Sequence, residues 1–596
     1  MKTKLTRRHF ARMTAAVAAA AGWKQVFAKG LFAAQMPVPQ PPTPQVEEPG
    51  AVTPEGVSGK PSSNAPASNA PEAQWSGHDS PELVAAALAN LPPMPPGPFK
   101  PTWDSIEQNY KDPEWFRDAK FGIMMHWGIY SVPAHGSEWY VRYMYGGNAG
   151  MMQWHTEHYG PPTKFGYKDF LPMYTAANWD PDAWAQLFKK AGAKYVLAPG
   201  EHHDGFSNWD SKINPYNAVN YGPHRDLDGD LIKAIRKVGL KTGISDHSFF
   251  HFVFIPALPG SDQYDPKWAN FYNVADKSNA ARIRFMHDWV AKRIETIDKY
   301  EPDMLWFDMA TDHAIDPLKT EVAAYYFNRA RQWGKQVGIS AKAAAWVSGQ
   351  IMDYEREGRA PMELVDWIWQ PDDPITDKFG YVTEQKVFGP EQFVWKIVEN
   401  TSKNGNLLLN ISPRADGTIP QEQQDTLLAI GRWLEINGEA IYSTRPWIKY
   451  GEGPVADAAA AAMVAVRAKG GFAGRLNGQN MGGTGVSGGG ISRNGYTSAD
   501  IRFTRNGDTL YATVMNWPDS DQPVTITSLQ IVNAGPISGS LGGKVQKVEL
   551  LGHPTPLKFT QTVEGLKITF PAEKPCDFVY SLKITGLKLP PANRST

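Results

Sequence analysis

The chain has 596 residues, a formal net charge of -1 and an apolar fraction of 42%. This composition suits a large globular core, and the lack of a long basic run argues against nucleic acid and anionic membrane surfaces as partners. Cys576 is the only cysteine, so an intramolecular disulfide is impossible and a cysteine-based metal site is not expected.

The N-terminal residues have the pattern of an export signal. Basic residues between Lys2 and Arg8 precede an Ala-rich stretch from Met13 to Ala21, and the Arg7-Arg8 pair fits the twin-arginine pattern. The apolar stretch is too short for a stable membrane span. We therefore predict a twin-arginine-type signal over residues 1–34 and a periplasmic or secreted location.

Residues 35–100 are rich in Pro, Ala, Ser and Asn. Such a stretch buries too little apolar surface to order itself, so it predicts a linker. One short helix is expected within it, from Pro81 to Leu91. Removal of the residues up to about Phe99 is accordingly expected to expose no core.

Strand-like and helix-like segments alternate over residues 101–446. The expected strands are 120–130, 194–199, 240–245, 304–308, 337–342, 364–369 and 406–411, and the expected helices are 179–191, 227–238, 281–300, 320–333, 390–402 and 420–437. Repeated strand–helix units of this total length predict an α/β fold with a (β/α)8-type barrel.

The pattern changes over residues 447–596. A glycine-rich stretch from 470 to 490 is expected to be a surface loop. Short alternating runs follow at 500–503, 509–515, 524–531, 545–550, 566–570 and 578–584. Several short strands separated by turn signals predict a C-terminal β-sandwich.

The most informative motif is the run from Leu305 to Met309, in which an apolar strand ends in a carboxylate. Alternate side chains of a strand share a face, so Trp306 and Asp308 point the same way. In a barrel the carboxyl end of the strand opens into the active-site mouth. An indole beside a carboxylate is suited to holding a sugar and attacking its anomeric carbon. The alternative is an Asp that caps the next helix.

Other polar side chains are expected at the same mouth. His126 ends the first strand, Glu138 and Trp139 follow on the next loop, and His202 and His203 end the second strand. Adjacent histidines on an extended segment point to opposite sides, so they form a poor chelating pair. We predict hydrogen bonding to sugar hydroxyls, and expect no metal and no other cofactor. For Glu138 the alternative is an exposed ion pair.

Several of these segments resemble the α-L-fucosidases of glycoside hydrolase family twenty-nine. The similar segments are 120–128, 136–140, 193–196, 202–206, 209–211, 302–308, 406–411, 416–420, 437–442 and 500–504. They occur in family order from about Trp103 to the C-terminus. The resemblance implies retaining hydrolysis of a fucosylated oligosaccharide or glycoconjugate. It places Asp308 at the nucleophile position and puts His126, Glu138, Trp139, His202, His203 and Trp306 at fucose-binding positions.

The chain departs from the family pattern at two places. Many members have a Tyr near the end of the third strand, where Asp246 or His247 stands here. Many members also place the acid/base Glu after a Trp, where this chain has Gln370, and an amide cannot donate and recover a proton.

The acid/base must therefore be sought among nearby carboxylates. Glu355 is favoured, followed by Asp372 and its neighbour Asp373, while Arg356 is a candidate sugar-binding residue. Two other functions stay open. Gln370 allows a pseudo-enzyme that binds fucose without turnover, and the His/Asp-rich mouth allows a metal-dependent hydrolase.

Overall fold

The computed structural model describes residues 79–308, 315–342, 345–357, 360–468, 495–519, 522–531 and 543–590. The predicted export signal and the glycine-rich stretch from 470 to 490 lie outside these ranges, as does most of the predicted linker. Within the described ranges, the search for a helix long and apolar enough to cross a membrane finds none.

A nine-stranded parallel sheet forms the barrel, in the order β7-β6-β5-β4-β3-β2-β1-β9-β8. The strands at the two ends of this order, β7 and β8, are separated along the chain only by Pro371. One chain segment therefore pairs with β6 on one side and with β9 on the other, which brings the sheet close to closure. The strands are β1 (Phe121–Met125), β2 (Tyr195–Glu201), β3 (Lys241–Asp246), β4 (Met304–Phe307), β5 (Gly338–Lys342), β6 (Ile351–Asp353), β7 (Trp369–Gln370), β8 (Asp372–Pro374) and β9 (Leu407–Ile411).

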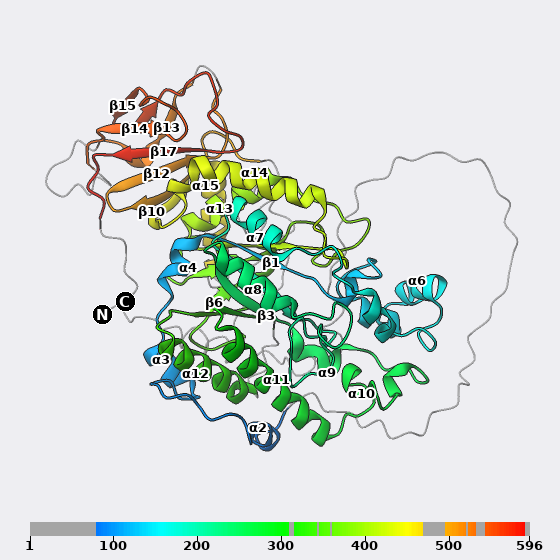
Figure 1. Cartoon of the computed structure of the whole chain (residues 1–596). Coiled ribbons are helices and arrows are strands. Elements are labelled where there is room, and N and C mark those ends of the chain that lie inside the picture. The colour runs from blue at the N-terminus through cyan, green and yellow to red at the C-terminus, as the bar shows by residue number, and fades with distance from the viewer. Residues whose placement is uncertain are drawn as a thin grey trace, which may run out of the picture. The chain divides into compact units, whose positions relative to one another are not determined.

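Helices surround the sheet, as the predicted barrel requires (Figure 1). The main ones are α7 (Pro181–Lys190), α8 (Leu227–Lys237), α11 (Asn279–Tyr300), α12 (Asp316–Gln332), α13 (Pro390–Ser402) and α14 (Gln421–Asn437). α11 begins where the Ser278 hydroxyl accepts the Ala281 N–H, and it ends at Glu301 in the left-handed region. Its inner face buries Met286, Trp289 and Ile294.

The last third of the barrel differs from the expectation. The predicted strand 364–369 is wrong except at its end, because strand pairing begins only at Trp369. β6 and β8 were not predicted, since each has only three residues and ends without an apolar run. Strands this short leave no periodicity to detect.

The linker prediction is also wrong for residues 79–100. Helix α2 (Pro81–Ala87) contacts α11, and the Ala87 carbonyl lies 2.9 Å from His287 Nδ1. Asp79 forms a buried ion pair with Arg282 of α11. The side-chain amide of Asn328 accepts a hydrogen bond from the Phe99 N–H and donates one to the Phe99 carbonyl. The helix expected over Pro81–Leu91 is confirmed as α2, whereas the charged and backbone contacts that order the rest of the segment leave no apolar periodicity to detect.

The C-terminal part contains two antiparallel sheets around one apolar core. The first sheet joins β10 (Arg445–Glu452), β11 (Ile501–Asn506), β12 (Thr509–Val514), β17 (Tyr580–Thr585) and β14 (Lys547–Leu550). The second joins β13 (Val524–Ile526), β16 (Gly565–Ile568) and β15 (Phe559–Thr562). This confirms the predicted sandwich, although β10, β15 and helix α15 (Pro454–Ala468) were not predicted.

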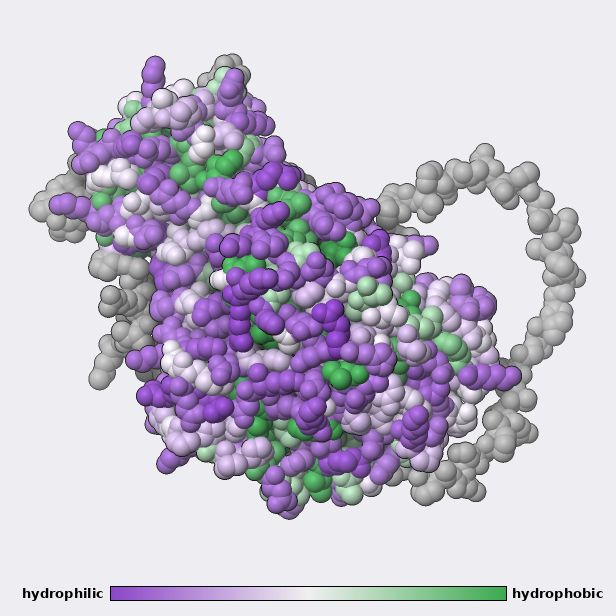
Figure 2. All heavy atoms as spheres, viewed as in Figure 1, coloured by the Kyte–Doolittle hydropathy of each residue, from purple (hydrophilic) through white to green (hydrophobic). Residues whose placement is uncertain are grey.

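Apolar side chains are mainly inside these two parts. On the face drawn in Figure 2 the surface is mostly hydrophilic, and hydrophobic residues form small separate areas. A buried ion pair between Glu399 of α13 and Arg502 of β11 links the barrel to the sandwich. Removal of Glu399 would leave the buried Arg502 without this carboxylate, so the two parts are held together by more than apolar contact.

Candidate active site

Asp308 stands at the carboxyl end of β4, where a barrel opens to substrate. Its backbone N–H donates to the Asp246 carbonyl at 2.9 Å, and its side chain is 19% exposed. Oδ2 lies 3.2 Å from His247 Nδ1 and 3.5 Å from His203 Nε2, while Oδ1 lies 3.3 Å from Lys342 Nζ.

These contacts fix the protonation state of Asp308. Burial alone would raise its pKa, but the Lys342 ammonium and the hydrogen bonds from His203 and His247 hold that pKa well below its ordinary value. The carboxylate is therefore ionised at neutral pH. An ionised, partly accessible carboxylate is the form that can attack an electrophilic carbon.

Three imidazole rings line the space beside Asp308. The His126 ring centroid is 5.2 Å from that of His202 and 4.8 Å from that of His247. Burial lowers the pKa of all three rings, so they are uncharged at neutral pH. A neutral imidazole can donate from one nitrogen and accept at the other, which suits hydroxyl groups.

Aromatic and acidic groups from other loops complete the wall. Trp139 meets His203 edge-on with ring centroids 5.9 Å apart. Glu138 is buried and its Oε2 accepts the Gly380 N–H at 3.2 Å, so the alternative of an exposed ion pair is wrong. The Trp306 ring lies 4.9 Å from that of His247. These contacts bring residues at predicted fucose-binding positions together near Asp308, and their contacts with sugar stay a prediction.

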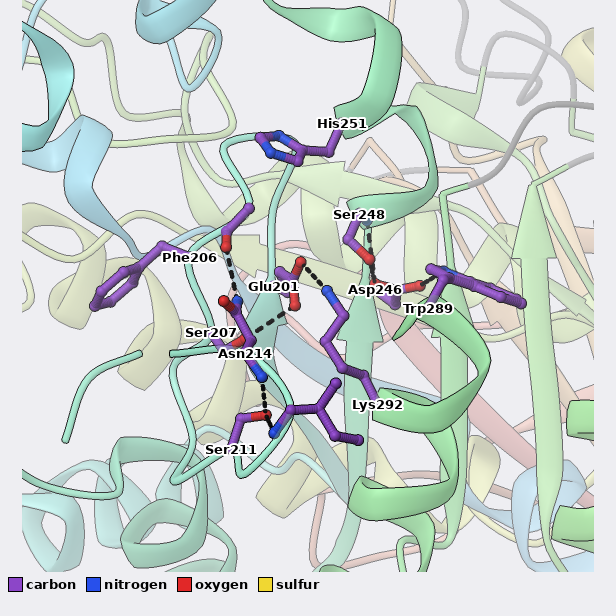
Figure 3. A network of polar contacts seen from close by, with 12 residues as sticks. Glu201, Phe206, Ser207, Ser211, Asn214, Asp246, Ser248, His251, Trp289 and Lys292 are labelled. Atoms are coloured by element: carbon purple, nitrogen blue, oxygen red, sulfur yellow. Dashed lines mark hydrogen bonds and ion pairs between the residues drawn. The ribbon is translucent and has the colours of Figure 1, made fainter. Parts of the chain in front are cut away.

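Asp246 is the exception among the predicted contacts. Its carboxylate faces α11, where it pairs with Arg293 and accepts from Trp289 Nε1 at 2.8 Å and from Ser248 Oγ at 2.6 Å (Figure 3). The next residue, His247, reaches Asp308 instead. Consecutive residues at a strand end point to opposite faces, so we replace Asp246 by His247 as the candidate substrate contact.

The network around Asp246 holds the strand ends that carry the histidines. Glu201, the last residue of β2, contacts Lys292 of α11 and accepts from Ser207 Oγ at 2.9 Å (Figure 3). Its carbonyl accepts the His247 N–H at 2.9 Å. Glu201 and Asp246 thereby anchor β2 and β3 to one helix, with His202, His203 and His247 directly beyond the anchors.

Asp246→Asn should destabilise the fold by about 3 kcal/mol, because it removes the nearer of the two carboxylates that face the buried Arg293 and leaves only Glu201, at 3.9 Å. Thermal or denaturant unfolding measures the loss, and Asp298→Asn on the outer side of α11 is the matched control. A substrate contact would behave differently. It would raise KM at an unchanged melting temperature, and that result would restore Asp246 to the sugar site.

Lys342 is a site residue that the sequence did not reveal. It ends β5, and its Nζ lies 3.3 Å from Asp308, 3.2 Å from Glu355 and 3.9 Å from Asp372. Burial opposes its charge, but the carboxylates, Asp308 first, raise its pKa well above the ordinary value. Its position at the end of a predicted strand was the available signal, the same signal that singled out Asp308.

The two acid/base candidates have opposite environments. The Glu355 side chain is 44% exposed, whereas Asp372 is fully buried and its carboxylate oxygens have no hydrogen-bond partner among the described residues. Burial and then the nearby Asp353 charge raise the pKa of Asp372 well above its ordinary value. Asp372 is therefore protonated but enclosed, and Glu355 is accessible.

The residues next to these two candidates also divide into buried groups and accessible groups. Gln370 is buried in the core and its Oε1 accepts from Tyr195 Oη at 2.6 Å. Asp353 accepts from Trp306 Nε1 at 2.7 Å, so it orients an aromatic wall. Arg356 is exposed and its guanidinium lies 4.6 Å from the centre of the Phe379 ring. Asp373 is buried 3.2 Å from Lys396 and is not brought to Asp308.

Comparison with known proteins agrees with this geometry. Residues 87–439 match the family model described as alpha-L-fucosidase, and residues 493–585 match the alpha-L-fucosidase C-terminal domain. Tissue alpha-L-fucosidase of Rattus norvegicus is 29% identical over 527 residues, which cover 84% of this chain and 96% of the rat protein. The Homo sapiens protein of the same name is 28% identical over 537 residues, with 85% and 96% covered.

Solved structures give the same result. The crystal structure of Thermotoga maritima alpha-fucosidase in complex with fucose has a TM-score of 0.61 to this chain at 28% identity, and it covers 82% of this chain and 100% of the other. The matched families span the barrel and the sandwich, and they confirm the resemblance found in the sequence. This chain belongs to the alpha-L-fucosidase family.

Proposed function

We propose that the chain is an exported, exo-acting α-L-fucosidase that hydrolyses terminal α-L-fucosides with retention, through a fucosyl ester of Asp308. Among relatives, the Thermotoga maritima enzyme is described in complex with fucose. The observation that carries the proposal is the ionised Asp308, held by Lys342, His203 and His247 beside aromatic walls. The substrate class is a fucosylated oligosaccharide or glycoconjugate.

The first step forms a bond between an Asp308 oxygen and the anomeric carbon. The bond from that carbon to the leaving oxygen breaks, and a carboxylic acid protonates the leaving oxygen. The same group, now a carboxylate, removes a proton from the water that cleaves the ester. Neutral His126 and His202 can bind sugar hydroxyls, while His203 and His247 orient the nucleophile.

Glu355 is the proposed acid/base. Asp308 and Glu355 contact the same ammonium group, at 3.3 and 3.2 Å, which is compatible with the ~5–5.5 Å carboxylate separation of retaining glycosidases. A general acid must also reach the leaving oxygen. Asp372 is protonated but has no accessible carboxylate oxygen, so accessibility favours Glu355.

Glu355→Gln should lower kcat/KM by about 10²–10⁴-fold on natural fucosides. Activated aryl fucosides should be less impaired in the glycosylation step, because they leave without a proton. The alkaline limb of the pH–rate profile should disappear as well. Asp372→Asn is the matched variant and should show neither effect. If the two variants exchange these behaviours, Asp372 is the acid.

Turnover of a chromogenic α-L-fucoside tests the activity itself. Hydrolysis with retention, followed by NMR of the first-formed fucose anomer, supports the proposal. Tight fucose binding without turnover would instead identify a pseudo-enzyme, the alternative raised by Gln370. The export part is tested separately, by cell fractionation and by sequencing the N-terminus of the mature protein.

A further inference from the structure

The structure places three histidines together that come from three strand ends. His126 follows β1, His202 follows β2 and His247 follows β3. Each offers one ring nitrogen, and these three nitrogens lie within 4.8 Å of one another. His202 and His203 remain a poor chelating pair by themselves, but His247 from the neighbouring strand supplies the third partner that the sequence lacked.

The hydrogen bonds of these rings leave nitrogens available for a ligand. His126 Nδ1 lies 2.7 Å from Asn410 Oδ1, so it donates there and Nε2 carries the lone pair. His247 Nδ1 donates in the same way to Asp308, again leaving Nε2. His202 Nδ1 is buried and has no hydrogen-bond partner in the described part of the chain.

This arrangement has the features of a metal-binding shell. In protein metal sites a ligating histidine usually donates its other ring N–H to a carbonyl or carboxylate, which fixes the tautomer and the direction of the lone pair. Asn410 and Asp308 play these parts for His126 and His247. Three uncharged imidazoles plus one oxygen ligand make a tetrahedral set of the kind that Zn²⁺ takes.

We propose that His126, His202 and His247 form a binding site for a borderline divalent transition metal, with Zn²⁺ as the first candidate. The fourth position would be taken by water, because Asp308 is held at Nδ1 of His247, on the side of the ring away from Nε2. Imidazole favours Zn²⁺, Cu²⁺ and Ni²⁺ over Mg²⁺ and Ca²⁺, which prefer oxygen ligands. The spread of up to 4.8 Å requires the rings to move inward slightly, since zinc–nitrogen bonds are about 2.0–2.1 Å.

The charges around the three histidines affect the affinity of the site for a metal ion. Asp308 favours a cation, whereas the Lys342 ammonium, 3.3 Å from Asp308, opposes it. Asp308 acts through His247, whose Nδ1–H it accepts, rather than as a metal ligand.

The metal would occupy the space that the proposed function gives to fucose. This part of the inference rests on the proposed function. The cation and the sugar would then exclude each other, so Zn²⁺ would inhibit by raising the apparent KM with kcat unchanged. A chelator would raise activity in zinc-containing buffer. A metal-dependent hydrolase would respond in the opposite way, losing activity to the chelator.

Metal binding is measured first by titrating the untagged full chain with Co²⁺ and recording its visible absorption. We expect one tetrahedral site per chain, displaced by Zn²⁺ and unaffected by Mg²⁺. His247→Tyr should weaken Co²⁺ binding at least tenfold while it keeps an aromatic donor beside Asp308. His126→Gln is the second variant, should the first fail to fold. His553→Gln, at a partly exposed histidine of the sandwich, is the matched control and should bind like wild type.

Competition is measured next, with an aryl fucoside and with fucose added to the Co²⁺ titration. Two results would support a shared site. Zn²⁺ should raise the apparent KM and leave kcat unchanged, and fucose should weaken Co²⁺ binding. A folded His247→Tyr or His126→Gln variant that binds Co²⁺ as wild type would overturn the inference, as would zinc that lowers kcat at constant KM. Binding of Co²⁺ to an enzyme without fucosidase activity would instead support the metal site and contradict the proposed function.

Discussion

Asp308→Gly should lower the turnover of α-L-fucosides by several orders of magnitude and leave the melting temperature nearly unchanged. The substitution removes the oxygen that attacks the anomeric carbon, so the covalent route is lost. The fold should tolerate it, because Asp308 lies at the barrel mouth with its side chain 19% exposed and Lys342 retains Glu355. Added azide should partly restore product release from an activated aryl fucoside, as a β-fucosyl azide.

The control for this experiment is Asp377→Ala, which removes an exposed carboxylate from the loop after β8. It should keep wild-type kcat and KM. Asp308→Gly with wild-type activity would remove Asp308 from the nucleophile position. A variant that is inactive but also unfolded at the assay temperature would not meet the prediction, which includes an intact melting temperature.

Truncation to Lys100 should cost the protein much of its stability, contrary to the linker prediction. The truncation removes α2, whose Val84 and Ala87 are buried, and also Asp79, which pairs with the buried Arg282. Breaking a buried ion pair by removal of one member costs about 3–5 kcal/mol. Chemical denaturation of chains that begin at Gly77 and at Lys100 measures the difference, and only the second should be destabilised.

A point substitution separates the ion pair from the rest of the segment. Asp79→Ala alone should reproduce most of the loss, since Arg282 stays buried against Phe249 and Phe252. Glu82→Ala on the exposed side of α2 is the matched control and should leave the unfolding free energy nearly unchanged. Equal stability of the two truncated chains would show that the segment contributes nothing to the barrel.

The sequence predicted the parts of the barrel that repeat. Helix α13 has the bounds predicted for it. Strand β4 ends at Phe307, directly before Asp308, and β5 ends at Lys342, both close to where apolar runs stop. The closing segment was not predictable in the same way. Its strands β7 and β8 have only two and three residues. They are recognisable as strands only by their pairing with β6 and β9, which exists only in the folded sheet.

The site shows a similar division. A strand end identifies Asp308, but a shift of one residue turns a side chain to the opposite face, which explains why Asp246 was wrong and His247 faces the nucleophile. Lys342 looks like an ordinary strand-end lysine until the ends of β4 and β6 and the start of β8 bring Asp308, Glu355 and Asp372 around it. Periodicity carries no information about such convergence of distant residues.

The most direct test of the proposed mechanism is to trap the covalent intermediate. An activated fluorinated α-L-fucoside, whose ester hydrolyses slowly, is incubated with the full chain, which is then digested and analysed by mass spectrometry. The account predicts one fucosyl label per chain, on Asp308. A label on any other residue, or steady turnover of the substrate with no labelled peptide at all, would contradict it.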